Sequence, residues 1–182
     1  MKTLIASSIA VIATTFSFAD IEAELTCSTP QFENYFEAQT ALANDDLSAA
    51  QTVTNSLLEL AKEKGCPLEG KECCAAELEA ASKIAKTTDI ATARRAFKRW
   101  SDALLTKLED SGLAEGPVYK MHCPMAFGNT GGTWLQNSSD LRNPYYGAMM
   151  LKCGMIQKEY ESKPESQSSH QANPHGAHHR SN

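Results

Sequence analysis

Four stretches of the chain carry apolar residues at helical spacing, and only short turns separate them. All four lie within residues 31–110, and they are the strongest constraint on the fold. Apolar side chains that recur every three or four residues line one helix face, which must be buried against another element. Because short turns place successive helices antiparallel, the pattern predicts an antiparallel four-helix bundle. No segment of this region alternates with a period of two, so we expect an all-α fold.

The apolar faces of the four expected helices can be read from the sequence. Helix by helix, their members are Phe32, Tyr35, Phe36 and Leu42; Ala50, Val53, Leu57, Leu58 and Ala61; Leu78, Ala81, Ile84 and Ala85; and Ile90, Ala93, Phe97, Trp100, Leu104 and Leu108. An aspartate in each of the turns 44–46 and 87–89 can cap the helix that follows. We expect Phe97 and Trp100 to be core residues rather than ligand contacts.

Residues 1–19 have the features of a secretory signal peptide. Lys2 provides a short positive region, and residues 4–13 are apolar but too few to span a membrane. Small residues then precede an expected cleavage site between Ala19 and Asp20. The alternative is an uncleaved anchor. With cleavage, the mature chain is secreted or periplasmic and has no transmembrane segment, and the oxidising compartment favours disulfides over free thiols.

Charge and motif content exclude several classes of function. The 182 residues carry a formal net charge of −5 and no run of Lys or Arg, which argues against nucleic acid as a partner. The chain has no G-x-S-x-G motif and no paired catalytic carboxylates. A thiol-redox enzyme based on Cys123 would lack a second cysteine at C-x-x-C spacing. We therefore expect neither an enzyme nor an organic cofactor.

The chemistry of the chain is concentrated in residues 117–155, which hold five of its six methionines and two of its six cysteines. Met121, His122, Cys123 and Met125 lie within five residues. Asn143-Pro144 predicts the start of a short helix, on which Met149 and Cys153 would share a face. Sulfur ligands in this number favour Cu(I). Three interpretations remain open at this point: a metal site, a disulfide between Cys123 and Cys153, or core packing without either.

The same segment resembles an uncharacterised bacterial domain family. The resemblance is carried by Met121–Ala126, Gly132–Leu135, Asn143–Gly147 and Met149–Gly154, and less specifically by Tyr35–Ala38 and Ala43–Ala50. The family occurs alone in secreted proteins and fused to periplasmic adaptor subunits of copper or silver efflux pumps. The resemblance covers about residues 31–156. It implies an all-helical fold and a role in handling copper or silver, with a periplasmic efflux adaptor as a partner.

Carried over to this sequence, the resemblance implies a set of soft-metal ligands. Its principal members are Cys123, Met125, Met149 and Cys153, with His122 and Met121 as further candidates. In an extended segment, the side chain of His122 would point away from that of Cys123. We therefore expect His122 to lie near the metal or at the surface without binding the metal directly.

Four other cysteines and four histidines lie outside that motif. Cys27, Cys66, Cys73 and Cys74 are even in number, which suits two disulfides, although a second soft-metal site is the rival interpretation. Three pairings are possible; a Cys66–Cys73 bridge is sterically easy and would leave Cys27 for Cys74. The histidines lie in a polar tail and could bind Cu(II), Ni(II) or Zn(II) weakly, or have no role: His170, His175, His178 and His179.

The sequence thus predicts four segments and one main function. The segments are a signal peptide (1–19), an N-terminal arm (20–30), a helical metal-binding domain (31–156) and a disordered tail (157–182). Within the domain, a Cys/Met-rich loop and a short helix pack on the bundle. The expected function is a buffer or carrier for Cu(I) or silver. The alternative is a disulfide-stapled helical module that docks a partner through its methionine-bearing surface.

Overall fold

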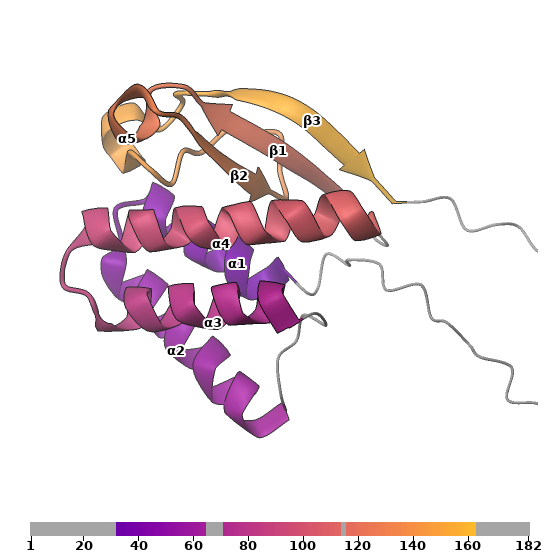
Figure 1. The fold of residues 1–182 in the computed structure, drawn as a ribbon. Helices are drawn as coiled ribbons and strands as arrows, with labels where there is room; N and C mark the ends of the chain where they lie inside the picture. Colours follow the sequence, from indigo (N-terminus) through magenta and orange to yellow (C-terminus); the bar gives the residue numbers. More distant parts are fainter. Residues whose placement is uncertain (1–31, 65–70, 114–115, 163–182) are drawn as a thin grey trace, which may run out of the picture.

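The computed structural model describes residues 32–64, 71–113 and 116–162, and Figure 1 shows their arrangement. Four helices form one part of the molecule, and a three-stranded sheet lies over the fourth of them. The predicted signal peptide, the N-terminal arm and the histidines of the tail lie outside the described residues. So do Cys27 and Cys66, and the side chains of Cys73 and Cys74 are not described either.

The four expected helices are present. They are α1 (Glu33–Ala43), α2 (Leu47–Lys64), α3 (Lys71–Lys86) and α4 (Ile90–Ser111), and successive helices pack against each other. The carboxylate of Asp46 accepts a hydrogen bond from the backbone amide of Ala49 at 2.8 Å. The carboxylate of Asp89 accepts from two backbone amides in the first turn of α4. Both aspartates therefore cap the helices that follow them, as expected.

Aromatic rings join α1 to α4. Tyr35 stacks on Phe97 with 4.7 Å between the ring centroids, and Trp100 meets Tyr35 edge-on at 5.3 Å. Such pairs contribute roughly 0.5–1.5 kcal/mol each beyond the burial of their area. Phe97 and Trp100 are fully buried, which confirms that they are core residues.

The prediction of an all-α fold is wrong. The segment expected to form a loop and a short helix contains three strands: β1 (Pro117–Cys123), β2 (Gly132–Gln136) and β3 (Met155–Glu161). β1 is central, and the other two strands pair antiparallel with it, one on each side. The fold is therefore mixed, and β3 continues past residue 156, where the domain was expected to end.

Two features of the strands explain why the apolar pattern of the sequence does not predict them. The pairing of β1 with β3 is irregular between Lys120 and Met121, and the buried residues of β1 (Val118, Met121 and Cys123) do not alternate strictly with exposed ones. β3 is exposed at every position from Met155 to Glu159, so it has no buried face to reveal by alternation. Strands of this kind depend on pairing and packing partners more than on their own apolar pattern.

A buried cluster of hydroxyl groups connects the helices to the sheet. The hydroxyl of Tyr35 lies 2.7 Å from Ser101 Oγ and accepts a hydrogen bond from the backbone amide of Leu135 at 3.0 Å. The hydroxyl of Tyr145 donates to the carbonyl of Thr133 at 2.5 Å. Leu135 and Thr133 belong to the edge strand β2, so these side chains satisfy backbone groups that have no strand beside them. Burial raises the pKa of both tyrosines well above the ordinary value.

In the part of the chain that the structure describes, none of the helices combines the length and the apolar character needed to cross a membrane.

Glu77 in α3 is a buried carboxyl group whose charge opposes folding. Only 2% of its surface is exposed, and burial raises its pKa to about 7, while the indole N–H of Trp100 offsets part of the rise. In the unfolded chain the group titrates near its ordinary value of 4.5. Between these two values the folded chain binds more protons than the unfolded chain. The free energy of unfolding therefore falls as the pH rises through this window, by roughly 3 kcal/mol in total.

We expect Glu77→Gln to remove this loss of stability, because the amide has no proton to lose. The measurement is urea denaturation at about pH 5 and about pH 8, from which the two free energies of unfolding are compared. Glu79→Gln, on the exposed side of the same helix, is the control and should leave the loss in place. An unchanged pH dependence in the Glu77→Gln protein would contradict the assignment.

Candidate soft-metal site

Three sulfur atoms meet near the end of β1. The Sγ atoms of Cys123 and Cys153 are 2.9 Å apart, and Met125 Sδ lies 3.9 Å from Cys153 Sγ. Cys123 is the last residue of β1 and is fully buried, whereas Cys153 is partly exposed and Met125 is 44% exposed. The group therefore has a thiol at its buried base and a thioether at the protein surface. We refer to Cys123 and Cys153 as the thiol pair.

The sheet and its aromatic neighbours position Cys123 and Met125. Cys123 pairs with Gly132 of β2, where a Cβ atom would lie 2.6 Å from the ring of Tyr145. Glycine is therefore required for Tyr145 to pack beside this end of the strand. The hydroxyl of Tyr146 donates to the carbonyl of Met125 at 2.6 Å, and Pro124 restricts the backbone between the two sulfur-bearing residues.

Cys153 is held by residues 137–154, here called the connector, which links β2 to β3. The central residue of this segment is Asn143, which is fully buried. Asn143 Nδ2 donates to the carbonyl of Cys153, and Asn143 Oδ1 accepts from the amide of Tyr145, both at 2.8 Å. The backbone amide of Asn143 donates to the carbonyl of Leu151, also at 2.8 Å. One buried side chain thus fixes the backbone of a candidate ligand.

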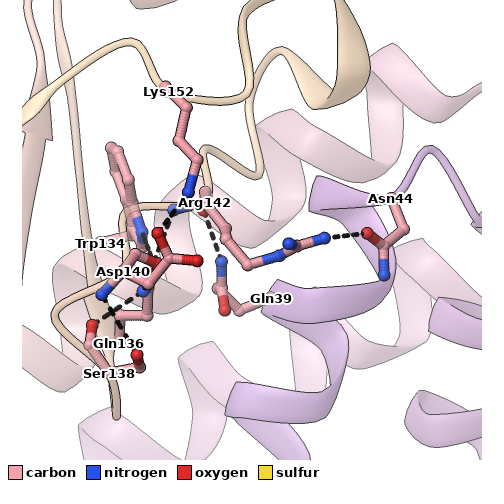
Figure 2. A network of polar contacts seen from close by, with 8 residues as sticks. All are labelled: Gln39, Asn44, Trp134, Gln136, Ser138, Asp140, Arg142 and Lys152. Carbon is pink, nitrogen blue, oxygen red and sulfur yellow. Dashed lines mark hydrogen bonds and ion pairs between the residues drawn. The ribbon is translucent and has the colours of Figure 1, made fainter.

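The first half of the connector is fastened to β2 and to α1, as Figure 2 shows. The buried side chain of Gln136 donates to the carbonyls of Ser138 and Asp140 at 2.8 and 2.7 Å. Gln39 of α1 donates to the carbonyl of Arg142 at 2.7 Å, and Arg142 in turn donates to the side chain of Asn44. The polar groups of this loop therefore have partners on two separate elements.

The second half of the connector is held by hydrogen bonds between its backbone and the two residues of an ion pair, Arg94 and Asp45. Arg94 of α4 contacts Asp45 at 2.6 Å and donates to the carbonyl of Pro144 at 2.9 Å. Asp45 also accepts from the amide of Ala148 at 2.8 Å, and these hydrogen bonds lower its pKa, that of Ala148 most of all. Gly147 has a φ of 63°, and a Cβ there would lie 2.1 Å from Asp45 Oδ1. Glycine thus permits both the turn and the ion pair beside it.

The structure separates the candidate ligands into two groups. It brings together Cys123 and Met125, which lie in one motif, and Cys153, which lies in another. It does not place Met149 with Cys153 on one helix face, and that expectation is wrong. The expected helix is only a 3-10 turn, Gly147–Met150, and Cys153 lies beyond it. Met149 is 82% exposed.

The two remaining candidates of the motif lie in β1. Met121 is fully buried opposite Trp134 of β2, as part of the core. His122 Nδ1 lies 3.0 Å from Thr133 Oγ1 on the neighbouring strand. Asn143, Asp45 and Arg94, which position the connector, were not expected to have this role. The Asn-Pro sequence at 143–144 was a signal for a special backbone position, but it was interpreted as a helix start.

The local electrostatics favour the protonated thiol of Cys153 in the metal-free protein. The hydrogen bond with Cys123 and partial burial raise the pKa of Cys153 to about 11. This is the opposite of the lowered pKa that activates catalytic cysteines. Among the described residues, no group of three or more His, Cys, Asp or Glu side chains could hold a metal ion. Any metal bound here would therefore depend on the thiol pair and the Met125 thioether.

Residues 32–116 match the model of a family described as a protein of unknown function, DUF3347. This match confirms the resemblance to an uncharacterised domain family. The DUF3347 match covers the helical part and ends before β1, so it does not include the thiol pair, and the fusion to efflux adaptors stays an expectation. Searches of the curated proteins and of the solved structures found no match.

Asn143 offers a direct test of how the connector is held. In Asn143→Asp a buried amide donor becomes a carboxylate facing the carbonyl of Cys153. We expect the free energy of unfolding to fall by about 2–4 kcal/mol, because a buried polar group loses its partner and gains a charge. Urea denaturation of the reduced, metal-free protein measures this. Asn137→Asp, at an exposed position of the same connector, should change stability by less than about 0.5 kcal/mol. Equal effects of the two substitutions would argue against the role of Asn143.

Proposed function

We propose that this protein binds Cu(I), or the chemically similar silver ion, through Cys123, Cys153 and Met125, and acts as a secreted or periplasmic buffer or carrier. The observation that carries the proposal is the convergence of two thiols and a thioether from two separate segments, within 2.9 and 3.9 Å of one another. An efflux adaptor as the receiving partner is part of the same proposal.

The donor set fits a soft ion better than a hard one. Thiolate and thioether sulfur select Cu(I), whereas Mg²⁺ and Ca²⁺ require several oxygen ligands. Lys152, the neighbour of Cys153 in the sequence, forms an ion pair with Asp140 of the same connector. Binding must displace the thiol protons, and a metal ion that bonds strongly to sulfur can do so. A set of three sulfur atoms also suits an ion of low coordination number better than tetrahedral zinc, which takes four ligands.

The surroundings of Cys153 give a soft ion a route to and from solvent. The large apolar side chains that are exposed in the described ranges are Met125, Met149, Met155 and Ile156. All of them lie in the segments that carry or adjoin the candidate ligands. Exposed methionine side chains are suited to contact a partner, because methionine adapts its shape to different surfaces. The surface around Cys153 and Met125 therefore favours transfer of a metal ion to a second protein over permanent storage.

The same surface supports a second candidate function, a helical interaction module that docks a partner without metal. The specific observation is the short distance between the thiols, which need only a small movement to form a disulfide when an external disulfide oxidises them. In that case Met125, Met149 and Met155 would serve only as contact residues. Metal titration of the reduced protein separates the two functions.

We expect the reduced protein to bind one Cu(I) tightly in competition with a chromophoric Cu(I) chelator under anaerobic conditions. Cys123→Ser and Cys153→Ser should each abolish tight binding, because each removes a thiolate. Met125→Leu should weaken binding roughly tenfold, which corresponds to about 1.4 kcal/mol. Zn(II) should compete poorly.

Two controls accompany the titration. Met149→Leu should leave the affinity unchanged, because Met149 is 82% exposed and does not share a helix face with Cys153. A chain that ends at Ser162 should also bind as the parent does, because the three sulfur ligands are retained. If both cysteine variants bind Cu(I) as the parent does, the proposed function is wrong.

A further inference from the structure

The two sulfur atoms of the thiol pair differ in access although they are in contact. Cys123 has none of its surface exposed, whereas Cys153 is partly exposed beside the accessible Met125. A molecule that approaches from solvent therefore reaches the sulfur of Cys153 first. Cys123 lies directly behind it, with its sulfur 2.9 Å away.

That distance is intermediate between two bonded states of a cysteine pair. A disulfide bond is about 2.05 Å long, whereas two thiolates on a three-coordinate metal with bonds of about 2.3 Å lie about 4.0 Å apart. The observed 2.9 Å is about 1 Å from either. The side chain of Cys153 is the partner better able to make the adjustment, because it is partly exposed, whereas that of Cys123 is fully buried.

We infer that Cys153 is a site of thiol–disulfide exchange and that Cys123 is its internal resolving thiol, so that external disulfides oxidise the pair in two ordered steps. The substrate class is a small or protein-borne disulfide. The inference about exchange stands on the geometry of the pair alone. Its consequence for metal binding rests on the proposed function. An oxidised pair has no thiolate that could bind a metal ion, so oxidation should prevent Cu(I) binding at this site.

The exchange takes place in two steps. Cys153 loses its proton to solvent, and its sulfur attacks one sulfur of the external disulfide, whose S–S bond breaks and releases one thiolate. Cys123 then loses its proton, and its sulfur attacks the sulfur of Cys153 in the mixed disulfide, releasing the second thiolate. The protein loses two electrons and two protons, and the external disulfide gains them as two thiols.

The difference in access predicts different behaviour of the two single variants. Reduced, metal-free protein is incubated with oxidised glutathione, and the products are followed by intact mass and peptide mapping, which also separates Cys123 and Cys153 from the other four cysteines. Cys123→Ser should accumulate a glutathione adduct at Cys153, because no resolving thiol is present. Cys153→Ser should form the adduct at Cys123 at least roughly tenfold more slowly, because Cys123 is buried. The parent should form the Cys123–Cys153 disulfide with little adduct.

A second measurement does not depend on the variants folding correctly. When the reduced parent protein is treated with a limiting amount of iodoacetamide, Cys153 should be alkylated before Cys123. Equal rates at the two cysteines, faster reaction at Cys123, or the absence of a Cys123–Cys153 disulfide in the parent after oxidation would each overturn the inference.

Metal titration keeps the two proposals distinct. After oxidation by glutathione, the parent should lose tight Cu(I) binding and recover it on reduction. If the reduced parent binds no Cu(I) but the ordered exchange is observed, the proposed function fails and the exchange site stands. If the reduced parent binds Cu(I) and the exchange is absent or unordered, the inference fails and the proposed function stands.

Discussion

The side-chain amide of Asn143 is the contact on which the candidate site depends most. This residue is fully buried and donates a hydrogen bond to the backbone carbonyl of Cys153, while its own oxygen accepts from the amide of Tyr145. Because both ends of the amide have partners, the buried group has no unsatisfied atom that would favour another arrangement. The hydrogen bond joins Asn143 to Cys153 within the connector, and the Cys153 backbone is thereby held beside β1.

The helices and the sheet contribute to this arrangement in different ways. The helices supply the apolar surface and the polar anchors, among them the Asp45–Arg94 ion pair and the Gln39 contact with Arg142. The sheet supplies the strand that ends in Cys123. Cys123 ends β1, and Cys153 lies two residues before β3, whose Met155 pairs with His122 of β1. Strand pairing therefore brings the two thiols close together, and the contacts of the connector with the helices hold the rest of that segment in place.

The chemistry of the pair follows from its unequal surroundings. Contact with Cys123 and partial burial raise the pKa of Cys153, so in the metal-free protein this thiol is protonated at neutral pH. Binding of a soft metal ion and formation of a disulfide bond are alternative ways to use the two sulfur atoms, and they require different separations of those atoms. The proposed carrier and the proposed exchange site are thus two outcomes of one geometry, and the redox state of the surroundings would decide between them.

The sequence by itself determined the helical half of the molecule and the types of atoms at the site. Stripes such as Ile90 to Leu108 and caps such as Asp89 are local signals, because helical spacing and capping depend on neighbours a few residues away. Sulfur chemistry could likewise be inferred from Cys123, Met125 and Cys153 alone. Only the tertiary structure decided that three segments of residues 117–161 form a sheet, that Met149 and Cys153 do not share a helix face, and that Asn143 closes a loop instead of starting a helix. The physical reason is that β3 has no buried face of its own and the connector has no regular period, so both take their shape from partners that are distant in the sequence.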